Sequence, residues 1–133
     1  MGAKKVEKVI MKYEFGLAAG TTAIATHKLG VLPAKATIIK AWIDVDTTFT
    51  SATDAATISL GYTGSAAAFE AATAISTGTT WDAAVPRVSD AAADGAVGNY
   101  VVIGSSPVEV VAVVAVEALT AGKGFLYIEY VLN

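Results

Sequence analysis

The fold is decided by residues 40–62, which read KAWIDVDTTFTSATDAATISLGY. In Lys40–Asp46, small and branched apolar residues alternate with Lys, Trp and Asp, which is the period-two pattern of a half-buried β-strand. The Thr-, Ser- and Asp-rich segment Thr47–Asp54 then predicts a turn, and Thr57–Tyr62 predicts a second strand. We therefore expect a central β-hairpin whose sheet is joined by further strands.

The other predicted strands are short and are separated by Gly-, Pro- and Thr-rich turns. They are expected at residues 6–15, 99–103, 108–117 and 125–132, with a short one at 22–26 inside a loop over 21–33. Leu119–Gly124 predicts the turn before the last strand. Val108–Glu117 and Phe125–Leu132 are largely apolar on both faces. Because a sandwich core buries only one face of a strand, the second apolar face indicates a further cover.

An alanine-rich run follows Ser65, which is placed as a helix N-cap. Alanine has the highest helix propensity, so we expect one short helix near residues 65–75. Roughly seven strands and the absence of alternating βα units predict an all-β fold, an antiparallel β-sandwich of jelly-roll type. The length predicts one domain over residues 1–133, with residues 1–5 either an ordered extension of the first strand or a flexible arm.

The composition is apolar and its charge is uneven. Hydrophobic residues make up 54% of the chain and charged residues 16%, against roughly 25% charged in typical domains, so we expect a partner to cover part of the surface. Residues 1–40 hold seven Lys against two Glu. We favour cross-strand pairing of Lys8 and Lys12 with acids such as Glu117 or Glu129. The alternative is a basic edge that faces nucleic acid or an acidic protein surface.

No residue pattern indicates catalysis, a cofactor or a membrane span. The chain has no cysteine, nucleophile elbow or phosphate-binding loop, and its single histidine, His27, has no second ligand or nucleophile near it in the sequence. Asp44, Asp46 and Asp54 do not fit the spacing of an EF-hand. They leave open an irregular cation site or simple capping of a turn by short polar side chains. We therefore assign no catalytic, metal-binding or cofactor-binding residue.

Two tryptophans leave a binding alternative open. Flat aromatic rings stack on sugars, so Trp42 or Trp81 would line the binding face of a carbohydrate-binding β-sandwich. A single tryptophan at a strand position is more often part of a core or of a protein interface. We favour the core or interface interpretation for both residues.

Two passages resemble the small virion structural proteins of tailed bacteriophages. They are AWIDVDTTFTSATDAATISLGYTG at residues 41–64 and VVAVVAVEALTAGKGFLYIEYVLN at residues 110–133. In that family a strand ending in Asp-x-Asp/Thr-x-Phe-x-Ser leads to an Ala-rich turn and an Ile-x-Leu-Gly strand, and the chain closes with Leu-Thr-Ala-Gly-x and an aromatic-rich strand ending in Glu-Tyr. The matching residues here are Asp44–Gly61 and Leu119–Tyr130.

The resemblance implies a non-enzymatic β-sandwich or jelly-roll protein that decorates or cements the phage head. Such a protein binds and stabilises the assembled head through symmetric homodimers or homotrimers, with the phage major capsid protein as its other partner. It is made in the host cytoplasm and lies on the head surface of the virion. A tail or neck position is the alternative, and neither a membrane nor nucleic acid is expected as a partner.

Seven residues are the candidates for these contacts. Val111, Val113, Phe125 and Tyr127 lie on the outward faces of the two doubly apolar strands, and we expect them to make the self-contacts. Lys4, Lys5 and Lys8 belong to the basic N-terminal segment and are expected to contact an acidic shell surface.

Overall fold

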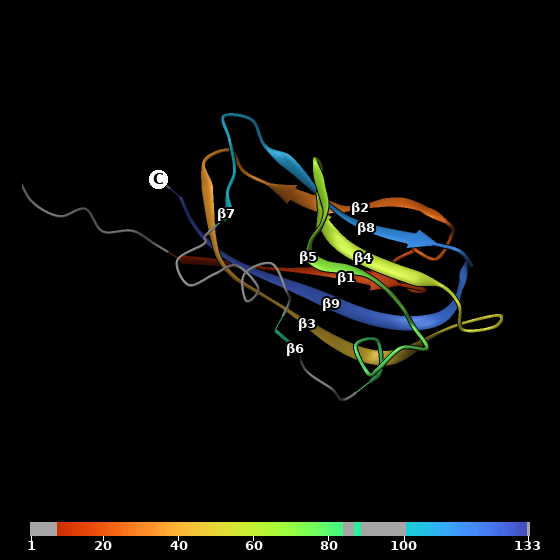
Figure 1. Cartoon of the computed structure of the whole chain (residues 1–133). Helices are drawn as coiled ribbons and strands as arrows, with labels where there is room; N and C mark the ends of the chain where they lie inside the picture. Colours follow the sequence, from red (N-terminus) through yellow and green to blue (C-terminus); the bar gives the residue numbers. More distant parts are fainter. Residues whose placement is uncertain (1–7, 84–86, 89–100, 133) are drawn as a thin grey trace, which may run out of the picture.

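The computed structural model describes residues 8–83, 87–88 and 101–132, and its regular elements are all strands. The strands are β1 Lys8–Gly16, β2 Ala25–Leu32, β3 Ala36–Ser51, β4 Thr57–Tyr62, β5 Ser65–Ala74, β6 Arg87–Val88, β7 Val101–Val102, β8 Val108–Ala115 and β9 Leu119–Leu132. Every pairing between them is antiparallel. They form the two sheets of a sandwich, which Figure 1 shows with β2, β8 and β4 above β1, β9 and β3.

The order of the strands defines a jelly roll. One sheet runs β1-β9-β3-β6, with β7 also paired to β3, and the other runs β2-β8-β4-β5. The chain changes sheet between β1 and β2, β2 and β3, β3 and β4, and β5 and β6, and it does so again on either side of β8. Two interlocked Greek keys of this kind are the jelly-roll topology. The predicted all-β, antiparallel sandwich of jelly-roll type is therefore confirmed.

The core lies between the two sheets and is filled by alternating residues of the longest strands. On β9 the inward residues Leu126 and Ile128 are fully buried, and on β8 the inward residues Val110 and Val114 meet them from the other sheet's side. Tyr13 closes the edge of the core, where its hydroxyl donates a hydrogen bond to the Val31 carbonyl oxygen at 3.3 Å. Burial, with a smaller contribution from Tyr130, raises the pKa of Tyr13 to about 12.

Three aromatic rings fill one end of the core. Phe15 and Phe49 stack at 5.4 Å, and Trp81 meets each of them edge-on at 5.9 Å. Two glycines of β9 make the space for them. A Cβ on Gly122, where φ is +131°, would collide with the Phe49 ring, and a Cβ on Gly124 would come within 2.8 Å of the Phe15 ring. Gly122 and Gly124, which the sequence predicts in a turn, are therefore strand residues whose lack of a side chain lets the aromatic rings pack closely.

Several predicted elements are wrong. Ser65–Ala74 forms strand β5 in place of the expected helix, because a tight turn at Gly64 folds it back on β4 and because Phe69 is buried in the core. Pairing and burial override the helix propensity of the alanines. Leu119–Gly124 belongs to β9, and Ala25–Leu32 forms a full strand where a loop with only a short strand at residues 22–26 was expected.

The central hairpin is also a wrong prediction, although its two strands are real. Lys40–Asp46 lies within β3 and Thr57–Tyr62 is β4, but the two strands belong to different sheets. The connection Ala52–Ala56 crosses the end of the sandwich. Strand periodicity indicates which face of a strand is buried, but it contains no information on which strand is its neighbour.

Candidate functional site: the aromatic and lysine face

Three aromatic side chains lie together on the outer face of the β1-β9-β3 sheet. Phe125 and Tyr127 alternate with the buried residues of β9, and Trp42 is the β3 partner of Tyr127. The Trp42 and Tyr127 rings stack at 5.1 Å with an angle of 5° between their planes, and Phe125 follows at 6.4 Å from Tyr127. All three side chains are half-buried, so they keep apolar surface open to a partner.

Lysine ammonium groups cover this aromatic row. The Nζ atom of Lys12 lies 4.0 Å from the centroid of the Phe125 ring, and that of Lys123 lies 5.5 Å from the same centroid. Lys40 Nζ lies 5.4 Å from the Trp42 ring. Cation–π contacts of exposed lysines contribute roughly 0.5–1 kcal/mol each. We call the three aromatic residues and these three lysines the aromatic and lysine face.

The predicted cross-strand pairing of lysine and acid is confirmed at one position. Lys8 Nζ lies 3.8 Å from a carboxylate oxygen of Glu129 on the neighbouring strand β9. Among the described residues Lys12 forms no such pair, because its ammonium group lies over the rings of Phe125 and Tyr127. The carboxylate of Glu117 binds the Ser51 hydroxyl and no lysine of the described ranges. Much of the basic N-terminal charge is therefore gathered on one sheet face.

The predicted contact residues separate into two groups. Phe125 and Tyr127 belong to the aromatic and lysine face, and Lys8 lies on the same sheet. Val111 and Val113 lie on the outer face of the opposite sheet. Val111 is only 4% exposed although it is outside the core, and Val113 is half-buried. One flat interface cannot include both groups. Lys4 and Lys5 lie outside the described residues.

Glu117 organises the connection between β3 and β4, a role that the sequence pattern does not reveal. Its carboxylate accepts hydrogen bonds from the hydroxyl of Ser51 at 2.6 Å, from the hydroxyl of Thr53 at 2.6 Å and from the backbone N–H groups of Thr53 and Ala55 at 3.1 Å. The hydrogen bond from the Ser51 side chain, followed by those from Thr53, lowers the pKa of Glu117 to about 2. An ionised carboxylate is thus built into this end of the sandwich.

The three aspartates of the alternative cation site have different surroundings, and Asp46 is exposed on β3. Asp54 accepts a hydrogen bond from the Ser51 backbone N–H at 3.1 Å and so caps its own turn, with a positive φ of 56°. Asp44 lies opposite Phe125 in the sheet register. No group of three metal-ligating side chains occurs among the residues that the structure describes. The turn-capping interpretation fits Asp54.

The two tryptophans have different environments. Trp81 is 1% exposed and belongs to the core, which agrees with the favoured interpretation. Trp42 lies at the surface, but its ring already contacts Tyr127 and the ammonium group of Lys40. The Nε2 atom of His27 forms a hydrogen bond of 2.7 Å with the carbonyl oxygen of Ala23, just before the start of β2.

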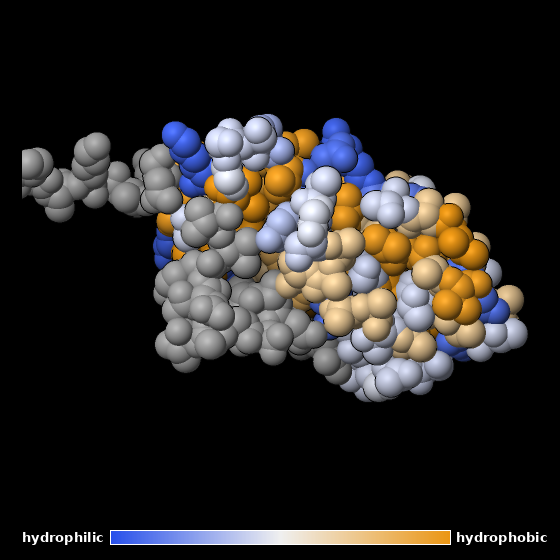
Figure 2. Space-filling view, turned by 45° about the horizontal axis from the view of Figure 1, so that its top comes forward, coloured by the Kyte–Doolittle hydropathy of each residue, from blue (hydrophilic) through white to orange (hydrophobic). Residues whose placement is uncertain are grey.

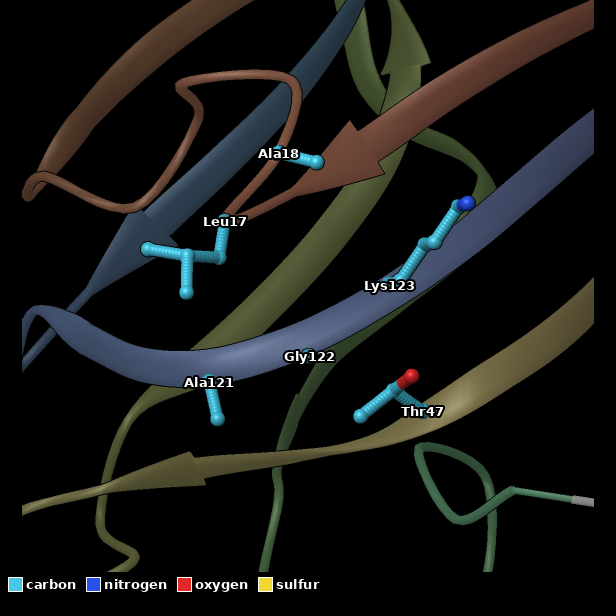
Figure 3. A pocket seen from close by; sticks show the side chains of 6 residues that line it. All are labelled: Leu17, Ala18, Thr47, Ala121, Gly122 and Lys123. Atoms are coloured by element: carbon cyan, nitrogen blue, oxygen red, sulfur yellow. The ribbon is translucent and has the colours of Figure 1, made fainter.

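A shallow pocket of about 300 Å³ lies just after the end of β1, beside the first residues of β9 and Thr47 of β3 (Figure 3). Its lining residues are Leu17, Ala18, Thr47, Ala121, Gly122 and Lys123. Lys123 is the single titratable side chain among these six, so the lining has no acid and base in one place. Within the part of the chain that the structure describes, no helix is long and apolar enough to cross a membrane.

Comparison with known proteins identifies the fold. No protein-family model and no curated protein matches the chain. A chain of the cyanophage Pam1 capsid matches with a TM-score of 0.68 and 19% identity, over 100% of this chain and 93% of that one. A chain of the capsid of Ralstonia phage GP4 matches with a TM-score of 0.63 and 19% identity, over 96% and 85%. A chain of the acid-stable capsid of Helicobacter pylori bacteriophage KHP30 matches with a TM-score of 0.50 and 22% identity, over 96% of this chain and 94% of that one.

These similarities concern the whole architecture. The sequence identities are low, so the matches show a shared jelly-roll fold and carry no residue roles. Each matched chain comes from a phage capsid and is covered over 85% or more of its length. The resemblance to phage virion proteins noted in the sequence therefore has a counterpart in the fold.

Proposed function

We propose that the chain is a non-enzymatic structural protein of a bacteriophage virion, and that it serves as a decoration or cement protein of the head. The observation that carries the proposal is the jelly roll itself, which matches chains of three phage capsids along nearly their whole lengths. Those capsid chains consist of little besides this fold. The sequence passages at residues 41–64 and 110–133 support the same class independently.

The aromatic and lysine face is the surface that we assign to the shell. Aromatic residues are enriched in the energetically important centres of protein interfaces. Trp42 and Tyr127 are held rigid by their stacking, so docking costs little side-chain entropy. The lysines share this face with Glu14, Asp44 and Glu129, so the face favours a surface of the major capsid protein that carries charges of both signs. Lys8 lies in β1 at the edge of the same sheet, and we assign Lys4 and Lys5, which precede it in the sequence, to contacts with acidic groups of the shell.

Stabilisation of the head follows from binding linkage. A protein that binds the assembled shell, and does not bind its loosened state, stabilises the shell by an amount that grows with occupancy. The chain needs no catalytic group for this work. It needs a rigid fold and a surface that matches two neighbouring shell subunits at once.

The test uses particles produced by the genome that encodes this chain. Mass spectrometry of purified particles should find the chain in many copies per head, and immunogold labelling should place it on the head. Heads that lack the chain should lose their DNA at a lower temperature, and added protein should restore the wild-type temperature. Absence of the chain from purified particles would refute the proposal, and labelling of the tail or neck would favour that alternative position.

A double substitution tests the docking face. Trp42→Ala with Tyr127→Ala should weaken binding to heads by at least tenfold, because buried interface aromatics commonly contribute more than about 2 kcal/mol. Ile24→Ala removes an apolar side chain outside this face that is more exposed, with 57% of the residue exposed, and should bind normally. Unchanged binding by the double variant, with its fold verified by circular dichroism, would move the docking surface to another face.

A carbohydrate-binding module is the second candidate, because Trp42 and Tyr127 form an aromatic row at the surface. The stacking argues against it. A sugar needs the open face of a ring, and the Trp42 ring contacts Tyr127 and Lys40. Retention on polysaccharide columns that is lost with Trp42→Ala would support the module in place of the virion role.

A further inference from the structure

Strand β1 is a free edge of its sheet. It pairs with β9 on one side, and no other described strand pairs with it on the other. Two apolar side chains of this edge are open to solvent, with Ile10 56% and Met11 38% exposed. Figure 2 shows that apolar areas also lie between polar ones on the face turned toward the viewer. An exposed edge with apolar side chains is a template for another strand.

The direction of each backbone group of β1 follows from the hydrogen bonds at its end. The Leu17 N–H donates to the carbonyl of Gly122, its direct partner in register. Hydrogen-bonded and non-hydrogen-bonded pairs alternate in an antiparallel ladder, so Phe15, Tyr13, Met11 and Val9 bond to β9. The N–H and carbonyl groups of Lys8, Ile10, Lys12 and Glu14 therefore point away from β9, toward the free side.

Thr21 marks where the free edge ends. Its hydroxyl accepts a hydrogen bond from the Gly16 N–H at 2.6 Å, and its backbone N–H donates to the Gly16 carbonyl oxygen at 3.0 Å. Gly16 also belongs to the outward series, so these bonds confirm the alternation. They also occupy the last outward pair of groups. Within the described residues, the edge available to a partner is thus Lys8–Glu14.

We propose that this edge pairs with the same edge of a second copy of the chain, antiparallel and with Met11 on the twofold axis. In this register Lys8 lies opposite Glu14 of the second copy, and Ile10 lies opposite Lys12. Both are pairs of outward-bonding residues, so each can exchange two backbone hydrogen bonds. The two β1-β9-β3 sheets then become one continuous sheet, and the interface is isologous.

The charges select this register over its neighbours. A shift that puts Ile10 on the axis places Lys8 opposite Lys12, and a shift that puts Lys12 on the axis places two Lys12 residues opposite each other. Like charges directly opposite destabilise a strand pair. A shift that places Lys12 opposite Glu14 requires the Gly16 groups that Thr21 occupies. The register centred on Met11 pairs every described residue of the free edge, Lys8–Glu14, and places no like charges opposite each other.

The surroundings of Glu14 are consistent with a charged partner on a second copy of the chain. It is half-buried, and it forms no ion pair with any other residue within the described ranges. Lys8 has an exposed ion pair with Glu129 at 3.8 Å and keeps 63% of its side chain exposed. Lys8 of the second copy would give Glu14 a cross-strand partner. Lysines on an edge strand normally prevent pairing with another strand. Here Lys8 can pair with Glu14 of the second copy, and it does so only in the register centred on Met11.

Cysteine cross-linking tests the register directly, because the natural chain contains no cysteine. Met11→Cys places two thiols opposite each other on the axis, at the Cα separation of a non-hydrogen-bonded pair, about 4.5 Å, which a disulfide accepts. Mild oxidation should convert most of this variant to a covalent dimer. Val9→Cys is the matched control, since its thiols would be displaced by four residues along the strand, roughly 13 Å. Equal cross-linking of both variants, or of neither, would overturn the proposal.

Charge exchange is the second test, and it does not depend on disulfide chemistry. By analytical ultracentrifugation, Glu14→Lys alone and Lys8→Glu alone should each raise the dimer dissociation constant about tenfold, because two like-charged pairs form. An equimolar mixture should recover the native value, because the heterodimer has only opposite pairs. Glu109→Lys makes the same charge change on the other sheet and should leave the constant unchanged. A mixture no tighter than its components would refute the paired edges.

The result is separable from the proposed function. The edge pairing stands on the geometry of β1 and is measured in solution, whereas the virion role is measured on particles. A monomeric chain that is found on phage heads would refute the edge pairing alone. A dimer through Met11 that is absent from particles would refute the virion role alone.

Discussion

At the residue scale, Glu117 is the side chain that holds the β3–β4 connection. Its four hydrogen bonds come from Ser51, Thr53 and Ala55. Glu117→Gln keeps the shape but replaces an acceptor-only carboxylate with an amide, whose NH₂ group cannot accept the hydrogen bonds. We expect a lower temperature of thermal unfolding at neutral pH, measured by circular dichroism.

The pH dependence of Glu117 has a definite sign. Its pKa is about 2 in the folded protein, below its ordinary value of 4.5. The folded state therefore favours the ionised form, and the resulting stability is present above pH 4.5 and is lost as the pH falls toward 2. The difference in unfolding temperature between wild type and Glu117→Gln should shrink over that interval. A difference that stays constant down to pH 2 would show that ionisation of Glu117 does not contribute.

Gly122 is the second residue with a specific structural demand. Its φ of +131° is unfavourable for a side chain, and a Cβ would collide with the Phe49 ring. Gly122→Ala should therefore destabilise the fold by about 2–4 kcal/mol, from overpacking and backbone strain together. Urea unfolding measures this loss. Gly104→Ala is the control, since its Cβ would meet no atom within 4 Å, and a similar loss in both variants would contradict the packing explanation.

At the element scale, periodicity correctly predicted the strands whose apolar and polar residues alternate strongly. It failed for segments whose secondary structure depends on packing against distant strands. Thr57–Tyr62 follows from pattern alone and is present, and so is the strand predicted over residues 108–117, which ends at Ala115. The alanines of β5 carry no strand pattern, because their state depends on pairing with β4 and on the burial of Phe69. Local composition cannot report a contact with a distant strand.

The candidate site shows the same division between pattern and pairing. Phe125 and Tyr127 were predictable as outward residues of an aromatic strand, and Trp42 as an outward residue of β3. Their assembly into one row depends on the register that places Trp42 opposite Tyr127. The position of Lys12 over Phe125 depends on the pairing of β1 with β9. No local sequence signal contains these two pairings.

The alternation of backbone groups in β1 makes a prediction for the element itself. Met11→Pro removes an N–H that bonds to β9 and should destabilise the fold by about 1–3 kcal/mol. Ile10→Pro removes an N–H that points to the free side, where proline is tolerated on an edge strand, and should lose less stability. Urea unfolding at low protein concentration compares the two variants. If Ile10→Pro proves the more damaging, the inferred alternation is reversed.

At the scale of the whole molecule, the topology joins the two ends of the described chain. β1 pairs with β9, and the buried cluster takes residues from both sheets. A jelly roll cannot lose one sheet without exposing the core of the other, so we expect a single cooperative unit over residues 1–133. Because most contacts join residues distant in sequence, we also expect folding on the scale of milliseconds to seconds.

Differential scanning calorimetry tests this cooperativity. One transition is expected, with equal calorimetric and van't Hoff enthalpies and an enthalpy of roughly 90 kcal/mol for 133 residues near 60 °C. The measurement belongs on the Glu14→Lys variant, because edge pairing would otherwise make the transition depend on protein concentration. Two resolved transitions would mean that part of the chain folds apart from the sandwich. A single transition would mean that the two sheets unfold together, so that a contact on the aromatic and lysine face stabilises both of them.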